Sequence, residues 1–222
     1  MNRLTMNGSL TRALLVGTIA SLATFVTIGG CDYGGTYTPG EDDDGYVIES
    51  TDGEAVNARV ESALTTAKLA VIKQAQPGDI LVSRGATCDW TLAGNGYWCH
   101  AALVSSAYPG FKTIEIGGPG KSVVETNSLT YYSGDSIRVG LVRVKAASAT
   151  QRSASVRWAR SQIGTPYSYT VSKTNLKSTY CALVPWRAYK MMSIDLDSDG
   201  GYWVLPDNIF VDGDVSILSV AQ

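Results

Sequence analysis

Between residues 79 and 145 the chain contains five short segments with the residue types of β-strands, and no segment there has the apolar spacing of a helix. Glycine, proline and asparagine separate the segments. Connections this short join antiparallel neighbours, so the pattern predicts an antiparallel sheet. The predicted strands are Asp79–Arg84, Ala101–Ser105, Lys112–Ile116, Ser122–Glu125 and Ser136–Lys145.

Helical patterns lie before and after this block of strands. Apolar residues recur at three- and four-residue spacing over residues 53–75, which Pro77-Gly78 follow. A second helix is predicted over Thr150–Ile163, a third over residues 179–192, and a last short strand near Val215–Val220. Strands in a block with helices on both sides indicate an α+β domain.

The first thirty residues have the pattern of a secretory signal peptide, which we exclude from the fold. A basic segment, Met1–Arg12, precedes the apolar run Ala13–Ile28, and small residues follow it. The ending Ile28-Gly29-Gly30-Cys31 resembles a bacterial lipobox, which implies that Cys31 is acylated and anchors the protein to a membrane. A plain signal peptide or an uncleaved anchor are the alternatives. We expect a lipoprotein of the cell envelope, on its periplasmic or extracellular face.

The remaining chain divides into a tether and one domain. Residues 31–52 are acidic and glycine-rich, which predicts a flexible tether, and residues 53–222 form the domain. Hydrophobic residues are 45% of the sequence, enough for a sizeable core. The net charge of −2 offers no basic surplus for phosphates, so no nucleic-acid partner is expected. We expect a monomer.

The sequence contains four cysteines and one histidine. A single histidine excludes a metal site with several histidine ligands, and no metal or organic cofactor is expected. If Cys31 is acylated, three thiols remain in an oxidising compartment. Cys88 and Cys99 lie in one glycine- and tryptophan-containing loop and could form a disulfide, which would leave Cys181. Sequence alone does not decide the connectivity, and three reduced thiols are the alternative.

Three motifs carry residues with catalytic chemistry. Trp98-Cys99-His100 precedes one predicted strand, Thr113-Ile114-Glu115 lies in the next, and Tyr180-Cys181 follows Thr165-Pro166-Tyr167. In this order the chain resembles the permuted NlpC/P60 cysteine peptidases and amidases, the YiiX-like branch of the papain-like superfamily. The resemblance covers residues 76–210 and implies a permuted papain-like fold with an antiparallel sheet packed against helices. It also implies amide hydrolysis, with peptidoglycan stem peptides as the leading substrate.

The chemistry of these residue types agrees with the roles that the resemblance implies. Cys181 is the candidate nucleophile, because the start of a helix favours a thiolate. His100 can pair with the thiolate and protonate the leaving amine, and Glu115 can orient the imidazole. The backbone N–H of Cys181 can donate to an oxyanion, and Tyr167 and Tyr180 are assigned to the substrate or oxyanion side.

Several alternatives stay open. Glu115 lies between two isoleucines and could face solvent, in which case Asp79 or Glu125 could orient the histidine. The related motif Tyr-Cys-Ser-Glu-Leu-Val-Trp is altered here after the cysteine, and Pro185 could disturb the helix. The domain could therefore be an inactive module that binds a cell-wall ligand. A lipid-directed amidase or acyltransferase is a further alternative, because related permuted folds act on acyl lipids and a tethered domain meets lipid easily. The acidic run over residues 195–200 lacks the glutamate of an EF-hand and is interpreted as a polar turn.

Overall fold

The computed structural model describes residues 64–85, 96–134 and 136–222. The expected signal peptide and tether, Cys31, Cys88 and the first part of the predicted helix at 53–75 lie outside the described residues. Within the described part, no helix is long and apolar enough to cross a membrane.

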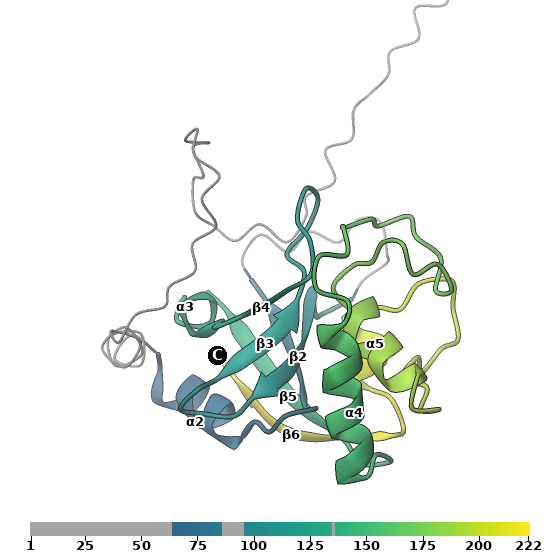
Figure 1. Ribbon diagram of the computed structural model, residues 1–222. Coiled ribbons are helices and arrows are strands. Elements are labelled where there is room, and N and C mark those ends of the chain that lie inside the picture. Colours follow the sequence, from purple (N-terminus) through teal and green to yellow (C-terminus); the bar gives the residue numbers. More distant parts are fainter. Residues whose placement is uncertain (1–63, 86–95, 135) are drawn as a thin grey trace, which may run out of the picture.

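A six-stranded antiparallel sheet forms the centre of the domain (Figure 1). Its spatial order is β4-β3-β2-β1-β5-β6. This confirms the predicted α+β class and the antiparallel sheet, and each predicted strand is present with its ends shifted by a few residues. The strands are β1 (Ile80–Arg84), β2 (His100–Ser106), β3 (Lys112–Glu115), β4 (Val124–Thr126), β5 (Arg138–Val144) and β6 (Val215–Ala221).

Helices cover both faces of this sheet. α4 (Ala149–Arg160) and α5 (Leu183–Lys190) lie on one side, and α2 (Thr66–Gln74) and α3 (Leu129–Tyr132) lie on the other (Figure 1). α6 (Pro206–Phe210) precedes the last strand. The sequence analysis missed α3 and α6, because helices of four or five residues are too short to show an apolar period.

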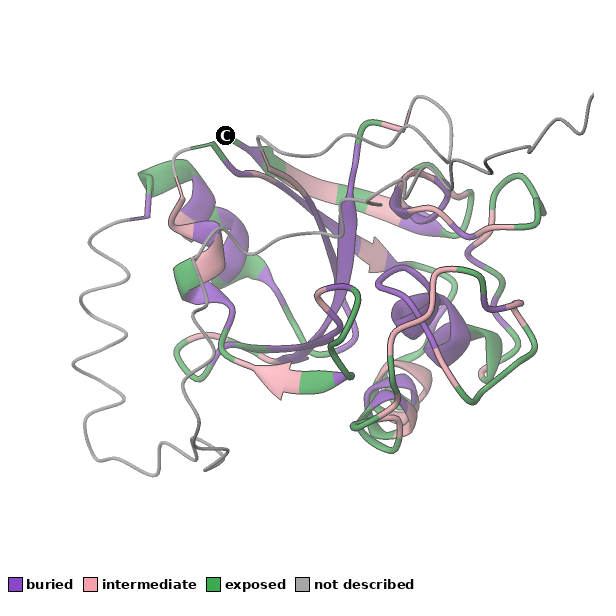
Figure 2. Ribbon diagram, turned by 90° about the horizontal axis from the view of Figure 1, so that it is seen from above, coloured by how far each residue is buried: buried purple, intermediate pink, exposed green. Residues whose placement is uncertain are grey.

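Because side chains alternate along a strand, each strand contributes to two separate cores. Ile80, Val82 and Leu103 pack with α4 and α5, whereas Leu81 and Val104 pack with α2 on the opposite face. The central strands are accordingly buried on both faces, as Figure 2 shows. This explains why their sequences are nearly continuous apolar runs rather than alternating ones.

The third predicted helix begins later than its sequence indicates. Residues 179–182 form a bridge and a turn, and α5 begins at Leu183. Pro185 is therefore the third residue of the helix, where a backbone N–H has no partner within the helix. The expected cost of a proline inside the helix does not arise at this position.

α5 is fixed to the start of β1 by a close contact. The Tyr189 hydroxyl donates to the carbonyl oxygen of Gly78. Gly78 has a φ of +91°, and a Cβ there would lie 2.6 Å from Cβ of Arg152 in α4. Glycine thus permits both the turn and the approach of the two helices that cover this face of the sheet.

Candidate active site

His100 and Glu115 meet on one face of the sheet. His100 is the first residue of β2 and pairs with Ser83 of β1, while β3 pairs with β2 through Leu103 and Ile114. Alternation places Glu115 on the face opposite to Ile114, so it faces away from the core that contains its isoleucine neighbours. Nε2 of His100 lies 2.6 Å from Oε2 of Glu115, and both residues are buried.

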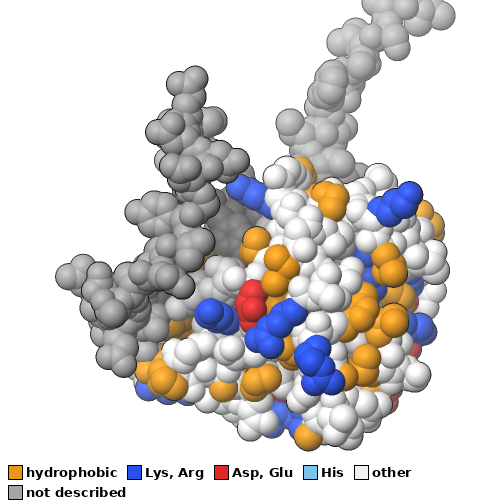
Figure 3. Space-filling view, viewed as in Figure 1, with side chains coloured by type: hydrophobic (Ala, Val, Ile, Leu, Met, Phe, Trp, Pro, Cys, Tyr) orange, Lys and Arg blue, Asp and Glu red, His pale blue; other side chains and the backbone are white. Residues whose placement is uncertain are grey.

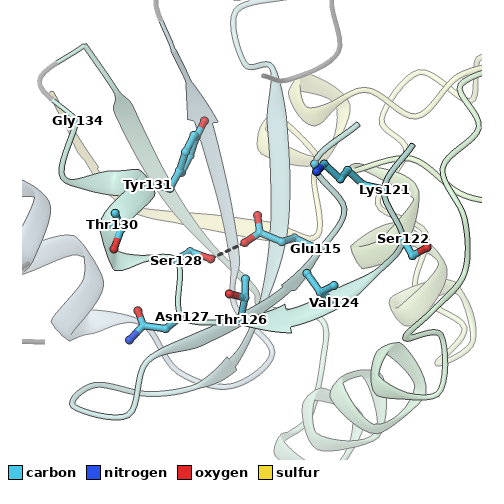
Figure 4. A pocket seen from close by; sticks show the side chains of 11 residues that line it. Glu115, Lys121, Ser122, Val124, Thr126, Asn127, Ser128, Thr130, Tyr131 and Gly134 are labelled. Atoms are coloured by element: carbon cyan, nitrogen blue, oxygen red, sulfur yellow. Dashed lines mark hydrogen bonds between the residues drawn. The ribbon is translucent and has the colours of Figure 1, made fainter. Parts of the chain in front are cut away.

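Two hydroxyls hold the other carboxylate oxygen of Glu115. Oγ1 of Thr113, two residues earlier on the same strand, donates to Oε1 at 2.8 Å. The hydroxyl of Ser128, just before α3, donates to the same oxygen, as the dashed line in Figure 4 marks. Thr113 and Ser128 are also within hydrogen-bond distance of each other. Glu115 is therefore anchored from two elements before it contacts the histidine.

Cys181 lies on the side of the His100 imidazole opposite to Glu115. It lies in the turn before α5, is 4% exposed, and its Sγ is 3.8 Å from the carbonyl oxygen of Cys99. Its thiol also lies close enough to the His100 side chain to raise the pKa of that histidine. Because Glu115 occupies Nε2, Nδ1 is the ring nitrogen left for Cys181; it is buried and has no hydrogen-bond partner among the described residues. The order is thus Cys181, Nδ1, Nε2 and Glu115.

The electrostatics favour a charged histidine. Burial lowers the pKa of His100, but its hydrogen bonds to Cys181 and Glu115 and their negative charges outweigh burial and raise it above its usual value. Burial raises the pKa of Glu115, but the hydrogen bond and charge of His100, with the two hydroxyls, lower it overall. An imidazolium between a carboxylate and a potential thiolate is therefore the favoured protonation state.

The rival carboxylates have other partners. Asp79 is fully buried, accepts from the backbone N–H of Gln76 at 2.8 Å, and forms a two-pronged ion pair with Arg143. Glu125 pairs with Arg160 of α4. Asp79 closes the turn that contains Pro77-Gly78, and only Glu115 among the three contacts His100.

The tyrosines around Cys181 have separate positions. The Tyr180 hydroxyl accepts from the backbone N–H of Val204 at 3.0 Å, and its ring lies 5.9 Å from that of Tyr169. Tyr167 packs against the core cluster that includes Cys181. Tyr169, which the sequence analysis missed, is near enough that the charge of Cys181 adds to burial in raising its pKa. Its stacking on Trp203 at 4.8 Å forms an aromatic wall that no sequence spacing indicates.

Arg187 holds the loop before the nucleophile. It is buried in α5 and donates to four backbone carbonyl oxygens in the preceding loop, those of Ser172, Lys173, Asn175 and Ser178. The turn at residues 195–200 is also closed by side chains. The ammonium of Lys173 donates to Asp197 and to the carbonyl oxygen of Gly201, which supports the interpretation as a polar turn.

The cysteines other than Cys181 fall outside this site's chemistry. Cys99 is disulfide-bonded, and Cys88, its expected partner, lies outside the described residues together with Cys31. Cys181 is a reduced thiol. The disulfide therefore holds the residue that immediately precedes His100 and whose carbonyl oxygen contacts Sγ of Cys181.

A cavity of about 680 Å³ opens on the Glu115 side of the site. β3, β4 and α3 form its walls, as Figure 4 shows, with Lys121 and Tyr131 facing each other across it. On the outer surface seen in Figure 3, lysine and arginine side chains are scattered among apolar ones, and the buried His100 does not show.

Comparison with known proteins supports the fold of the domain alone. No family model matches the chain, and no curated protein matches it. Among solved structures, the chain is similar to the metalloprotein YiiX from Escherichia coli O157:H7, with a TM-score of 0.56 and 17% sequence identity. The match covers 67% of this chain and 99% of YiiX. The two proteins have related folds.

Proposed function

We propose that this protein is a lipid-anchored cysteine hydrolase of the cell envelope that cleaves amide bonds, with peptidoglycan stem peptides as its substrates. The observation that carries the proposal is the buried series of Cys181, His100 and Glu115, in which Nε2 of the histidine contacts Glu115 and the buried Nδ1 is left for the thiol. The fold relationship to YiiX agrees with it, and the substrate rests on the family resemblance alone.

The reaction follows from the order of contacts. The thiolate of Cys181 attacks the amide carbon, and the tetrahedral intermediate collapses when the imidazolium gives its Nδ1 proton to the leaving amine. The resulting thioacyl enzyme is hydrolysed by water, with neutral His100 as the general base that recovers the proton. Glu115 stays ionised and accepts from Nε2–H throughout, so it is a positioning residue that stabilises the charged imidazole.

YiiX is described as a metalloprotein, so we tested whether the residues of this chain fit a metal ion. The described residues contain no group of three or more histidine, cysteine, aspartate or glutamate side chains placed to hold one. Nε2 of His100 is occupied by Glu115, so Nδ1 and Cys181 would be the only two ligands that this series offers among the described residues. The residues do not fit a metal at this position, and no step is derived through one.

The direct test is hydrolysis of soluble stem peptides by the lipid-free mature protein, with new amino groups followed by mass spectrometry. We expect turnover in the wild type, none in Cys181→Ala, and a large loss in His100→Ala. Lys145→Ala, a change at an exposed lysine after β5, is the control and should retain the wild-type rate. Wild-type protein that cleaves neither stem peptides nor simple amides would refute the hydrolase.

A second candidate, a ligand-binding module without turnover, is favoured by the burial of the nucleophile. Cys181 is 4% exposed and His100 is 2% exposed, so a substrate reaches Sγ only if neighbouring side chains move. Stem peptides that bind equally to the wild type and to Cys181→Ala, with no turnover in either, would establish this module instead.

The anchor is tested separately, because Cys31 lies outside the described residues. Cells that express the full chain and grow with labelled palmitate should incorporate label into the wild type and not into Cys31→Ser. Equal labelling of the two proteins would remove the lipid anchor from the proposal and leave the hydrolase untouched.

A further inference from the structure

Two arginines lie side by side at the end of the sheet that carries His100. Arg84, the last residue of β1, is directly opposite Arg138, the first residue of β5. Both contact Tyr97, because Arg84 donates to its carbonyl oxygen at 2.6 Å and Arg138 donates to its hydroxyl. The two guanidinium carbons lie 5.2 and 5.9 Å from the centre of the tyrosine ring.

Neither of these two positive charges has a negative partner among the described residues. None of the five ion pairs between described residues includes either arginine. Like charges directly opposite each other on antiparallel strands repel, and their Cβ atoms lie about 5 Å apart. The tyrosine supplies neutral acceptors and the face of a ring, which reduce the repulsion without neutralising the charge.

The pair lies on the Cys181 side of the sheet. Arg84 follows Ser83, the residue that pairs with His100, so its Cα lies on the order of 6 Å from that of His100, and the two side chains project from opposite faces. Alternation places Arg84 on the same face as Ile80 and Val82, which belong to the core cluster that includes Cys181. Tyr97, between the arginines, precedes by two residues the Cys99 carbonyl that contacts Sγ.

We infer that Arg84 and Arg138 form a subsite that binds a carboxylate group of the peptide substrate next to the scissile amide. The inference rests on the proposed hydrolase and adds its substrate specificity. Two guanidinium groups present parallel N–H donors that match the planar carboxylate, and an anion bound between them offsets the repulsion between the two arginines. Tyr97 is 41% exposed, so solutes can reach the pair beside its ring.

The test uses stem peptides in which each carboxylate is replaced in turn by a carboxamide of the same shape. We expect one position at which the carboxylate peptide has a kcat/KM about tenfold to a hundredfold higher in the wild type. Arg84→Gln and Arg138→Gln should each reduce this preference, and the double variant should abolish it. Added salt should weaken the preference in the wild type and leave the double variant unchanged.

Arg157→Gln is the matched control, because Arg157 is an exposed arginine of α4 on the described surface. It should keep the full preference for carboxylate. Arg84→Lys keeps the charge without the planar donors and should keep part of the preference, which separates anion binding from a loss of folding. A double variant that folds and still prefers the carboxylate, or a wild type with no preferred position, overturns the inference.

Two further measurements separate this inference from the proposed function. If no peptide is cleaved, binding of the same peptide pairs to Cys181→Ala is measured by ligand-observed NMR. Carboxylate-selective binding that requires both arginines keeps the subsite while the hydrolase is lost. Glycerol phosphate could instead inhibit the wild type and not the double variant, with no carboxylate position preferred. In that case the arginine pair binds a phosphate group, and the carboxylate assignment is wrong.

Discussion

Glu115→Gln removes the charge next to His100 and keeps the shape of the side chain. In the wild type, Oε2 accepts from Nε2 of His100, while Thr113 and Ser128 donate to Oε1. A glutamine offers one oxygen and one N–H₂ group, so it cannot accept from both sides. If its oxygen stays with the hydroxyls, its N–H₂ group faces Nε2, which must then be unprotonated. The variant therefore favours neutral His100.

The size of the effect follows from that one contact. A hydrogen bond between charged partners contributes about 1.5–3 kcal/mol, more than a neutral one. Losing it from the imidazolium shifts the equilibrium between the charged and neutral Cys181–His100 pair by about tenfold to a hundredfold. The pKa of His100 should fall by about one to two units for the same reason.

The assay is the rate of iodoacetamide labelling at Cys181 against pH, followed by mass spectrometry of the peptide that contains it. Wild-type protein should label rapidly well below pH ~8.5, which is the pKa of an ordinary cysteine thiol. Glu115→Gln should label about tenfold or more slowly near neutral pH. Glu125→Gln is the control, because Glu125 lies opposite Ile114 on the neighbouring strand and pairs with Arg160. Identical profiles for wild type and Glu115→Gln would refute the reasoning.

Three predictions concern stability and are measured by urea unfolding. The lowered pKa of Glu115 adds to the free energy of unfolding above pH ~4.5, and this contribution is lost as the pH falls through the pKa of the folded protein. The raised pKa of His100 adds a contribution that is complete below pH ~6.5 and is lost as the pH rises through the pKa of the folded protein. Stability should therefore be greatest between these values, and a profile equally curved in Glu115→Gln would contradict the assignment. Arg187→Lys should cost about 2–3 kcal/mol, because an ammonium cannot reach four carbonyl oxygens, while Arg157→Lys should cost little. Gly140→Ala should cost about 1–3 kcal/mol, because its Cβ would lie 2.9 Å from Phe210 and 3.0 Å from Val82; Gly213→Ala, with no atom within 4 Å, should be close to neutral.

The strands could be predicted because their signal is local. β1, β2 and β5 are apolar on both faces and bounded by turn residues, so composition alone marks them. The residue at which a helix begins depends on contacts beyond its own sequence, and α5 is an example. Its apolar residues continue back to residue 180, but the turn at Cys181 and Ala182 delays the helix until Leu183. Pro185 looked disruptive only because the helix was placed too early.

The histidine and its carboxylate could be proposed from sequence, but the choice among three acids could not be made there. Glu115, Asp79 and Glu125 each lie near a strand, and alternation leaves the direction of each side chain open. The register between β2 and β3 decides it, because it sets which side of β3 faces His100. Ser128 could not be found in advance, since it lies in a connection after β4 and reaches Glu115 only through the pairing of β3 with β4.

The same dependence on register links the two parts of the proposed site. The pairing of β1 with β2 places His100 beside Ser83, and the pairing of β1 with β5 places Arg84 beside Arg138 one residue further along. His100 and Arg84 project from opposite faces of the sheet, and a shift of either register by one residue would turn His100 or Arg138 to the other face. β1 therefore fixes the distance between the candidate catalytic histidine and the arginine pair. Because this spacing is set by a central strand buried on both faces, a substrate whose carboxylate is one residue nearer to or farther from the amide should be a poor one.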